Sequence, residues 1–234
     1  MRFLKRLVRR LQRNLNHFRA VFPKYARIDS AVRLHEYSLM GGIFLDRPSE
    51  VIESLRNTPT NQLLDNGEFY PLFYNSNPKT LDLLGRLVGE LRPNTVVETG
   101  VANGASTRKI LASFSELGLS QSKLFSLDVD PRVATPDLVS NPQFQFVLVD
   151  SSRSFVSSMH EIGAIDLFYH DSDHSYKNQM LEYSVAWEKL NPEKGVLISD
   201  DVNWSNAFLD FCKRVNRFPL LLSDGSTVSG VISK

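Results

Sequence analysis

Short apolar runs alternate with helix-like segments from residue 95 onward, and this alternation limits the available folds more than any other feature of the sequence. The runs expected to form strands span residues 95–98, 124–128, 144–149, 165–170 and 195–199. Helices are expected over 105–117, 151–162 and 205–216, after Pro131, and from Tyr176 to a stop at Pro192. Each helix returns the chain to a parallel neighbouring strand through a right-handed crossover, so the pattern predicts a doubly wound α/β sheet.

Two further elements are expected at the ends of this sheet. Asn77, followed by a proline, is a typical helix start, and the apolar residues after it share one face: Leu81, Leu84, Leu87, Val88 and Leu91. At the other end, segments 218–222 and 227–232 flank Asp224-Gly225, which favours a tight hairpin turn. We therefore expect a mostly parallel seven-stranded sheet with a C-terminal antiparallel hairpin, preceded by a helical N-terminal extension.

Composition narrows the class of protein. With 234 residues, of which 42% are hydrophobic and 23% charged, the chain suits one large domain with an extension. The single cysteine, Cys212, excludes an intramolecular disulfide or a cysteine-based zinc cluster and fits a reducing compartment. No apolar run approaches the ~18 residues that a membrane span needs, and no uninterrupted apolar region follows Arg9-Arg10, so no secretory signal is expected. We therefore predict a cytoplasmic protein.

The charge is unevenly distributed along the chain. Residues 1–33 carry ten Lys and Arg against one acid, whereas the remaining 201 residues carry 17 basic and 25 acidic groups. Because the main domain is acidic, nucleic-acid binding is not expected. Within residues 1–22, apolar side chains recur on one face of a basic amphipathic helix: Leu4, Val8, Leu11, Leu15, Phe18 and Phe22. This face either packs on protein, including a second subunit of a homo-oligomer, or lies on an anionic membrane surface.

A glycine-containing turn follows the first strand, from Glu98 through Gly100 and Gly104 to Ser106. Glycines let the backbone turn tightly and let a ligand approach the start of the next helix. The dinucleotide fingerprint is not met, because alanines occupy its second and third glycine positions. Glu98 suits a ligand with an ammonium group better than a diphosphate. The alternative is an ordinary turn in which Ser106 caps the helix.

Acidic residues end the next two strands as well. Asp128 ends the second strand, where a carboxylate can bind ribose hydroxyls, and Asp150-Ser151 ends the third, where an adenine edge commonly lies. A simple strand-end turn would also explain Asp128. Because the carboxyl ends of parallel strands meet at the crevice where such sheets bind ligands, we interpret the three acids as parts of one site.

The densest acidic cluster follows the fourth and fifth strands. Asp171, Asp173 and His174 follow the fourth strand, and Asp200-Asp201 follows the fifth. Converging carboxylates repel one another unless a hard cation such as magnesium binds between them, and His174 beside such a site could accept a proton. The alternative is that Asp173 caps the long helix, His174 packs on it, and Asp200-Asp201 forms a solvated turn.

In this order, the motifs resemble those of class I S-adenosylmethionine-dependent methyltransferases over residues 68–234, leaving 1–67 as a basic helix and helical cap. The stretch from Asp166 to Tyr176 is most similar to small-molecule O-methyltransferases of the cephalosporin-hydroxylase-like and sugar-modifying groups. The resemblance extends to metal-dependent catechol and caffeoyl-coenzyme A O-methyltransferases. Their metal-binding Asp matches Asp171, their basic Lys falls on His174, and their Asp-Asn metal pair falls on Asp200-Asp201.

This resemblance implies a Rossmann-like fold and a role for each site residue. The cofactor S-adenosylmethionine would contact Glu98, Gly100 and Gly104 with its methionine part, Asp128 with its ribose, and Asp150 and Ser151 near its adenine. Ser106 and Asp171 would also bind the cofactor. The acceptor would be a hydroxyl of a small molecule such as a sugar or a phenol, with His174 or Asp173 taking its proton. A magnesium or similar divalent cation would be held by Asp171, Asp200 and Asp201.

Two other functions fit parts of the same sequence. A nicotinamide-dependent oxidoreductase would share the sheet and Asp128, but it would make no use of the acids after the fourth and fifth strands. A non-catalytic membrane-associated adaptor would depend on residues 1–22 and would make the cytoplasmic protein peripheral to a membrane. Binding of S-adenosylhomocysteine, of NAD or of neither distinguishes the three functions.

Overall fold

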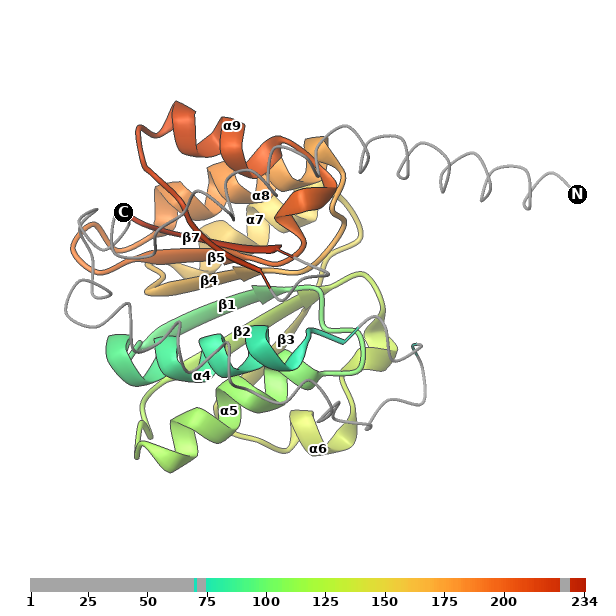
Figure 1. Cartoon of the computed structure of the whole chain (residues 1–234). Helices are drawn as coiled ribbons and strands as arrows, with labels where there is room; N and C mark the ends of the chain where they lie inside the picture. The colour runs from blue at the N-terminus through green and yellow to red at the C-terminus, as the bar shows by residue number, and fades with distance from the viewer. Residues whose placement is uncertain (1–69, 71–74, 224–227) are drawn as a thin grey trace, which may run out of the picture.

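The computed structural model describes Tyr70 and residues 75–223 and 228–234 (Figure 1). They form a seven-stranded sheet in the order β3-β2-β1-β4-β5-β7-β6. The strands are β1 (Thr95–Thr99), β2 (Lys123–Asp128), β3 (Phe144–Leu148), β4 (Leu167–His170), β5 (Val196–Ser199), β6 (Leu220–Ser223) and β7 (Val228–Ser233). Strands β1 to β5 are parallel, and β7 runs antiparallel to both β5 and β6. The predicted fold is confirmed.

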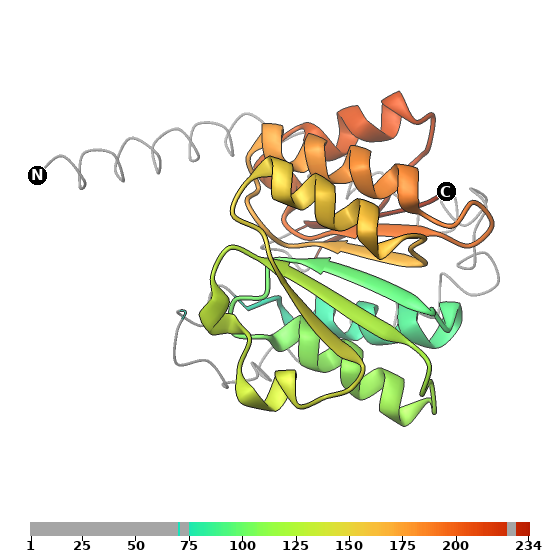
Figure 2. The same cartoon turned by 180° about the vertical axis from the view of Figure 1, so that it is seen from behind.

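Helices cover both faces of this sheet (Figures 1 and 2). One face carries α4 (Pro78–Leu91), α5 (Ala105–Glu116) and α6 (Pro136–Val139), and the other carries α7 (Ser152–Ile162), α8 (Tyr176–Lys189) and α9 (Ala207–Arg214). Two short 3₁₀ turns are η4 (Pro131–Val133) and η5 (Val202–Trp204). Because both faces are covered, the central strands are apolar throughout rather than alternating. Val97 and its register partner Phe168 pack toward α8, whereas Val96 and Leu167 pack toward α4.

Helix α4 begins as its sequence predicts. The Asn77 side chain accepts hydrogen bonds from the backbone N–H groups of Lys79 (2.9 Å) and Thr80 (3.0 Å), which have no partner within the helix. The five apolar residues expected on its inner face are all buried. Because the residues just before this cap line the candidate site described below, the start of α4 also fixes the position of Ser76.

Helix α9 begins two residues later than predicted. The chain first makes the turn η5, and the Ser205 hydroxyl then accepts a hydrogen bond from the N–H of Ala207 (3.0 Å). Against β7, a Cβ atom on Gly230 would lie 2.3 Å from the ring of Phe208. The glycine therefore lets α9 lie directly on the sheet.

The predictions for residues 1–67 and for most of the aromatic stretch 68–74 lie outside the described residues. The division of the chain at residue 67, the amphipathic helix and its membrane or subunit contact therefore stay predictions. Among the residues that the structure does describe, no helix is both long enough and apolar enough to cross a membrane.

Replacing Asn77 by Ala should lower the free energy of unfolding by ~1 kcal/mol, because two backbone N–H groups lose their acceptor. Urea denaturation of the whole chain measures this. Asn77→Ser is the matched control, since a serine hydroxyl also caps helices, and it should stay within a few tenths of a kcal/mol of the wild type. An Asn77→Ala variant as stable as the wild type would contradict the capping role.

Candidate active site

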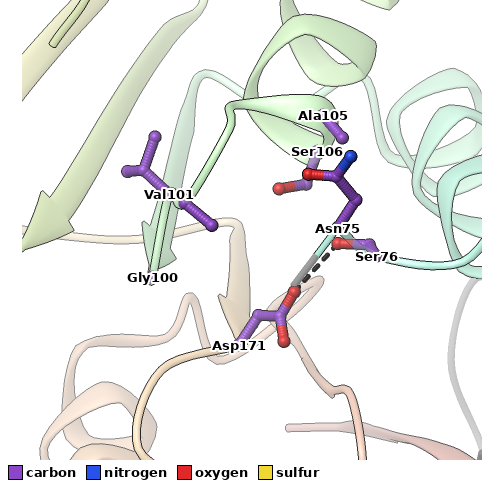
Figure 3. A pocket seen from close by; sticks show the side chains of 8 residues that line it. Asn75, Ser76, Gly100, Val101, Ala105, Ser106 and Asp171 are labelled. Atoms are coloured by element: carbon purple, nitrogen blue, oxygen red, sulfur yellow. Dashed lines mark hydrogen bonds between the residues drawn. The ribbon is translucent and has the colours of Figure 1, made fainter. Parts of the chain in front are cut away.

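A pocket lies at the carboxyl ends of β1 and β4, where the strand order reverses. The chain leaves β1 toward β2 on one side, while β4 lies on the other side, and such reversal points are where open α/β sheets bind ligands. The pocket is lined by Asn75, Ser76, Gly100, Val101, Ala102, Ala105, Ser106 and Asp171. Figure 3 shows Asn75 and Ser76 between the start of α5 and Asp171.

The glycine turn forms one wall of the pocket. Gly100 has a φ of +83°, and a Cβ atom built on it would lie 2.1 Å from the backbone oxygen of Asp171. Gly104, at the start of α5, has a φ of +78°. A side chain at Gly100 would therefore meet both an unfavourable backbone conformation and a steric clash with the loop after β4.

Glu98 lies beneath this turn rather than in the pocket. Its carboxylate is fully buried and accepts hydrogen bonds from the hydroxyls of Ser106, Thr107 (2.6 Å) and Ser126 (2.7 Å). Burial raises the pKa of Glu98 to about 7, although the three hydroxyls act in the opposite direction. In this arrangement, Glu98 positions Ser106, which itself lines the pocket. The Ser106 hydroxyl thus binds Glu98, and Gly104 occupies the N-cap position of α5.

Asp128 connects the end of β2 to the glycine turn. One carboxylate oxygen accepts a hydrogen bond from the N–H of Val101 (2.7 Å), and the other accepts one from the N–H of Asp130 (2.9 Å). The side chain stays partly exposed. Since a carboxylate has about four acceptor positions, Asp128 keeps capacity for a ligand diol beside the pocket.

Asp150 and Ser151 lie exposed at the end of β3. Asp150 accepts hydrogen bonds from the hydroxyls of Ser151 (3.0 Å) and Ser154 (2.9 Å), and Ser151 caps α7 through the N–H of Ser154 (3.2 Å). Neither residue is among those that line the pocket at Gly100. Their part in adenine binding remains a prediction.

Tyr70 and Asn103 form a contact that sequence reasoning missed. The Asn103 side chain pairs with both the N–H (3.0 Å) and the C=O (2.9 Å) of Tyr70, and the Tyr70 hydroxyl donates to Asp130 (2.9 Å). Tyr70 therefore bridges the glycine turn and the loop after β2. Nothing in the sequence marked Asn103 as the partner of Tyr70.

Asp171 forms the opposite wall of the pocket. One of its carboxylate oxygens accepts hydrogen bonds from the hydroxyls of Ser76 (2.8 Å) and Tyr169 (2.9 Å), and the Ser76 bond is drawn in Figure 3. Burial raises the pKa of Tyr169 well above its ordinary value, and the charge of Asp171 adds to this effect. The tyrosine therefore stays a neutral hydrogen-bond donor. The other oxygen of Asp171 lies 3.6 Å from Nε2 of His174.

Asp200 approaches the same region from β5, as the sequence predicts. It is buried and accepts hydrogen bonds from the hydroxyls of Ser229 (2.8 Å) and Thr80 (3.4 Å). Burial raises the pKa of Asp200, and the negative charges of Asp171 and Asp201 raise it further. The acids after β4 and β5 therefore lie close enough to repel one another.

His174 carries the compensating charge. Burial lowers the pKa of His174, but a hydrogen bond to Asp171 and the charges of Asp201 and Asp200 outweigh burial and raise it to about 9. The imidazole is therefore protonated at neutral pH in this arrangement. Asp173 instead lies exposed and accepts hydrogen bonds from the N–H and the hydroxyl of Ser175 (3.0 Å each). Ser175, not Asp173, is the N-cap of α8.

The acids have the right chemistry for a hard cation but not the arrangement. Carboxylate oxygens are the ligands that magnesium prefers, and their mutual repulsion favours any positive charge between them. Within the described ranges, however, no three His, Cys, Asp or Glu side chains are placed to hold a metal ion. One oxygen of Asp171 and one oxygen of Asp200 already accept two hydroxyl hydrogen bonds each.

Comparison with known proteins agrees with this geometry. The sequence profile of a family described as a methyltransferase domain matches residues 97–202, just under half of the chain. A putative caffeoyl-CoA O-methyltransferase from Staphylococcus aureus has a TM-score of 0.56 at 12% identity, over 68% of this chain and 85% of that one. An S-adenosylhomocysteine-bound methyltransferase from Podospora anserina has a TM-score of 0.56 at 13% identity, over 88% and 96%.

A third solved structure is described as holding Mg and S-adenosylmethionine. It has a TM-score of 0.51 at 18% identity, over 67% of this chain and 72% of that one. A search of the curated proteins found no match. At these identities, the solved structures establish the fold, and the family profile establishes the domain. Residues 97–202 therefore match the profile of a methyltransferase domain family, and the described residues share the fold of these solved methyltransferase structures.

Proposed function

We propose that this protein transfers a methyl group from S-adenosylmethionine to a hydroxyl of a small molecule. The observation that carries the proposal is the pocket at the strand reversal, where the glycine turn and Asp171 of the matched segment face Ser76. The solved structures that hold S-adenosylmethionine or its product support the choice of cofactor. The family match favours this function over an oxidoreductase or a non-catalytic adaptor.

The pocket offers groups suited to an amino acid moiety. Asp171 supplies a negative charge for an ammonium group, and Ser76, whose hydroxyl donates to Asp171, lines the same space. The backbone at Gly100 leaves room for close approach. Asp128 would take the ribose hydroxyls at the neighbouring strand end, and Asp150 with Ser151 would lie toward the adenine.

The bound cofactor supplies an electrophilic methyl group, which the acceptor oxygen takes while the C–S bond breaks and S-adenosylhomocysteine leaves. The task of the protein is mainly to align the two reactants and to receive the acceptor proton. We assign that proton to His174, whose ring lies 3.6 Å from Asp171. Because His174 is protonated at neutral pH, it accepts a proton only after losing the one it holds. No step above depends on a metal ion.

We propose that a small-molecule acceptor binds beside Asp171 and His174. A second copy of the chain or an anionic membrane surface would contact residues 1–22. A screen of hydroxyl compounds with isotopically labelled methyl donor would identify the acceptor.

The first test is cofactor affinity. The chain should bind S-adenosylhomocysteine and not NAD, and Asp128→Ala should weaken that binding by ~1–3 kcal/mol, because hydrogen bonds to a charged group are lost. Isothermal calorimetry measures both. Asp82→Ala, which removes a surface ion pair with Arg86 on α4, is the control and should bind as the wild type does. Tight NAD binding would overturn the proposed class of enzyme.

The second test is the pH dependence of turnover. Since only the neutral imidazole accepts a proton, kcat should rise with pH and level off above the pKa of His174, about 9. His174→Ala should remove this rise and slow turnover by roughly 10²–10⁴, with cofactor affinity nearly unchanged. His160→Ala, an exposed histidine on α7, should behave as the wild type. A pH profile that survives His174→Ala would exclude His174 as the base.

The pH profile of kcat also tests whether a metal ion binds beside His174. A divalent cation held by Asp171, Asp200 and Asp201 would add positive charge beside the imidazole and lower its pKa, so the rise should move to lower pH. The assay compares excess chelator with added magnesium or manganese. Identical rates and profiles in chelator and in magnesium would contradict the metal site.

A further inference from the structure

A buried cluster of polar residues lies behind the pocket, centred on Glu182 of α8. The Glu182 side chain is 8% exposed and its carboxylate accepts four hydrogen bonds. One oxygen accepts from the hydroxyl of Ser172 (2.7 Å) and the side-chain amide of Asn178 (2.8 Å). The other accepts from the hydroxyl of Thr99 (2.5 Å) and Nδ1 of His170 (2.8 Å). We call these five residues the Glu182 cluster.

Glu182 is charged in this position. Burial raises the pKa of its carboxyl group, but the charge of His170 and the hydrogen bonds from the cluster outweigh burial and hold the pKa below its ordinary value. A buried carboxylate is tolerated only when hydrogen bonds replace its lost hydration, and bonds to a charged acceptor are the strong kind. The hydrogen bonds to the charged Glu182 carboxylate therefore hold its four partners in place.

The partners of Glu182 adjoin both walls of the pocket. Thr99 directly precedes Gly100 in the glycine turn, and its backbone oxygen accepts a hydrogen bond from the N–H of Asp171 (2.8 Å). His170 and Ser172 flank Asp171 in the chain. One carboxylate therefore connects the end of β1 with the acidic turn after β4.

The cluster also reaches His174. The ring of His170 contacts the ring of His174 edge to face, with centroids 5.4 Å apart and planes at 89°. The bond from Nδ1 of His170 to Glu182 fixes the orientation of the His170 ring, and this ring in turn limits where the His174 ring can lie. Glu182 itself is not among the residues that line the pocket.

We infer that Glu182 is a positioning residue, which sets the distance between the glycine turn and the acidic turn that carries Asp171 and His174. This inference rests on the proposed function, in which the glycine turn and Asp171 bind the methyl donor and His174 faces the acceptor. Loosening the connection should misalign the two reactants, and a misplacement of ~1 Å can slow a reaction by ~10²-fold. Cofactor affinity should change less than kcat, because the N–H of Asp171 still donates to the backbone oxygen of Thr99 and Asp128 still accepts from the N–H of Val101.

The test variant is Glu182→Gln, which keeps the size of the side chain. An amide nitrogen donates and cannot accept, so one side of the group no longer accepts from its two donors. We expect kcat to fall by roughly 10–10²-fold, while KM for S-adenosylmethionine and the Kd for S-adenosylhomocysteine stay within about threefold. The matched control is Glu188→Gln, an exposed position on the same helix, which should change neither. The acceptor is the compound found by the labelled-donor screen.

A second variant addresses the acidic turn alone. Ser172→Ala removes one donor to Glu182 without changing α8, and it should lower kcat in the same direction. Because both variants remove one shared contact, their effects in the double variant should be smaller than the product of the single effects. Hydrogen–deuterium exchange of residues 171–178 should become at least tenfold faster in Glu182→Gln and stay unchanged in Glu188→Gln.

These measurements distinguish failure of the positioning role from failure of the proposed function. A Glu182→Gln protein with wild-type kcat, or with cofactor affinity reduced as much as kcat, would overturn the positioning role. Unchanged exchange in residues 171–178 would overturn it as well. If the wild-type chain binds no S-adenosylhomocysteine and transfers no methyl group, the proposed function fails, while the exchange measurement still decides whether Glu182 holds the turn.

Discussion

The close approach of two backbones, at Gly100 and Asp171, is the constraint on which the rest of the site depends. The strands that carry them are direct neighbours, with Thr99 opposite His170, so both chains leave the sheet at the same place. A single Cβ atom on Gly100 would lie 2.1 Å from the Asp171 carbonyl oxygen. Any other residue would push the two turns apart. The pocket, Ser76 included, is built around this contact.

Three buried carboxylates surround that contact, and each is stabilised differently. Glu98 accepts three hydroxyl hydrogen bonds below the glycine turn and has a pKa of about 7. Glu182 accepts four hydrogen bonds behind the pocket and stays ionised. Asp200 accepts two hydroxyl hydrogen bonds, and neighbouring acids raise its pKa. The negative charges of the acids after β4 and β5 therefore lie close together, and the positive charge of His174 lies beside them.

The sequence was sufficient for the fold and for part of the site. Parallel strands covered on both faces are continuous apolar runs, so the alternation of strands and helices could be predicted from the sequence. Asp171 and Asp200 were predicted to lie near each other because the carboxyl ends of parallel strands lie at one edge of the sheet. The direction in which a side chain points could not be predicted from the sequence. Glu98 was expected near a ligand, but the pleat turns it beneath the turn. Glu182 gave no signal, because a charged residue on a helix usually faces solvent.

Contacts between the segment at the start of α4 and the strand ends could not be predicted from the sequence either. Thr80 of α4 reaches Asp200, which lies 120 positions further along the chain, and Ser76 reaches Asp171 across 95 positions. No periodicity encodes such pairs. They matter because α4 precedes the whole sheet, yet Ser76 just before it and Thr80 in its first turn donate hydroxyl hydrogen bonds to the acids of the site. The acids are thus held by the protein before any ligand binds.

These hydroxyl hydrogen bonds would compete with a cation for the acids after β4 and β5. A metal ion that takes the oxygens of Asp171 and Asp200 which already accept hydrogen bonds would displace the hydroxyls of Ser76, Tyr169, Thr80 and Ser229 as well as water. Hydrogen bonds to charged groups contribute about 1.5–3 kcal/mol each, so their loss would oppose metal binding appreciably. The same displacement would free Ser76, which lines the cofactor pocket. A cation that binds through these oxygens would therefore alter the pocket wall through Ser76.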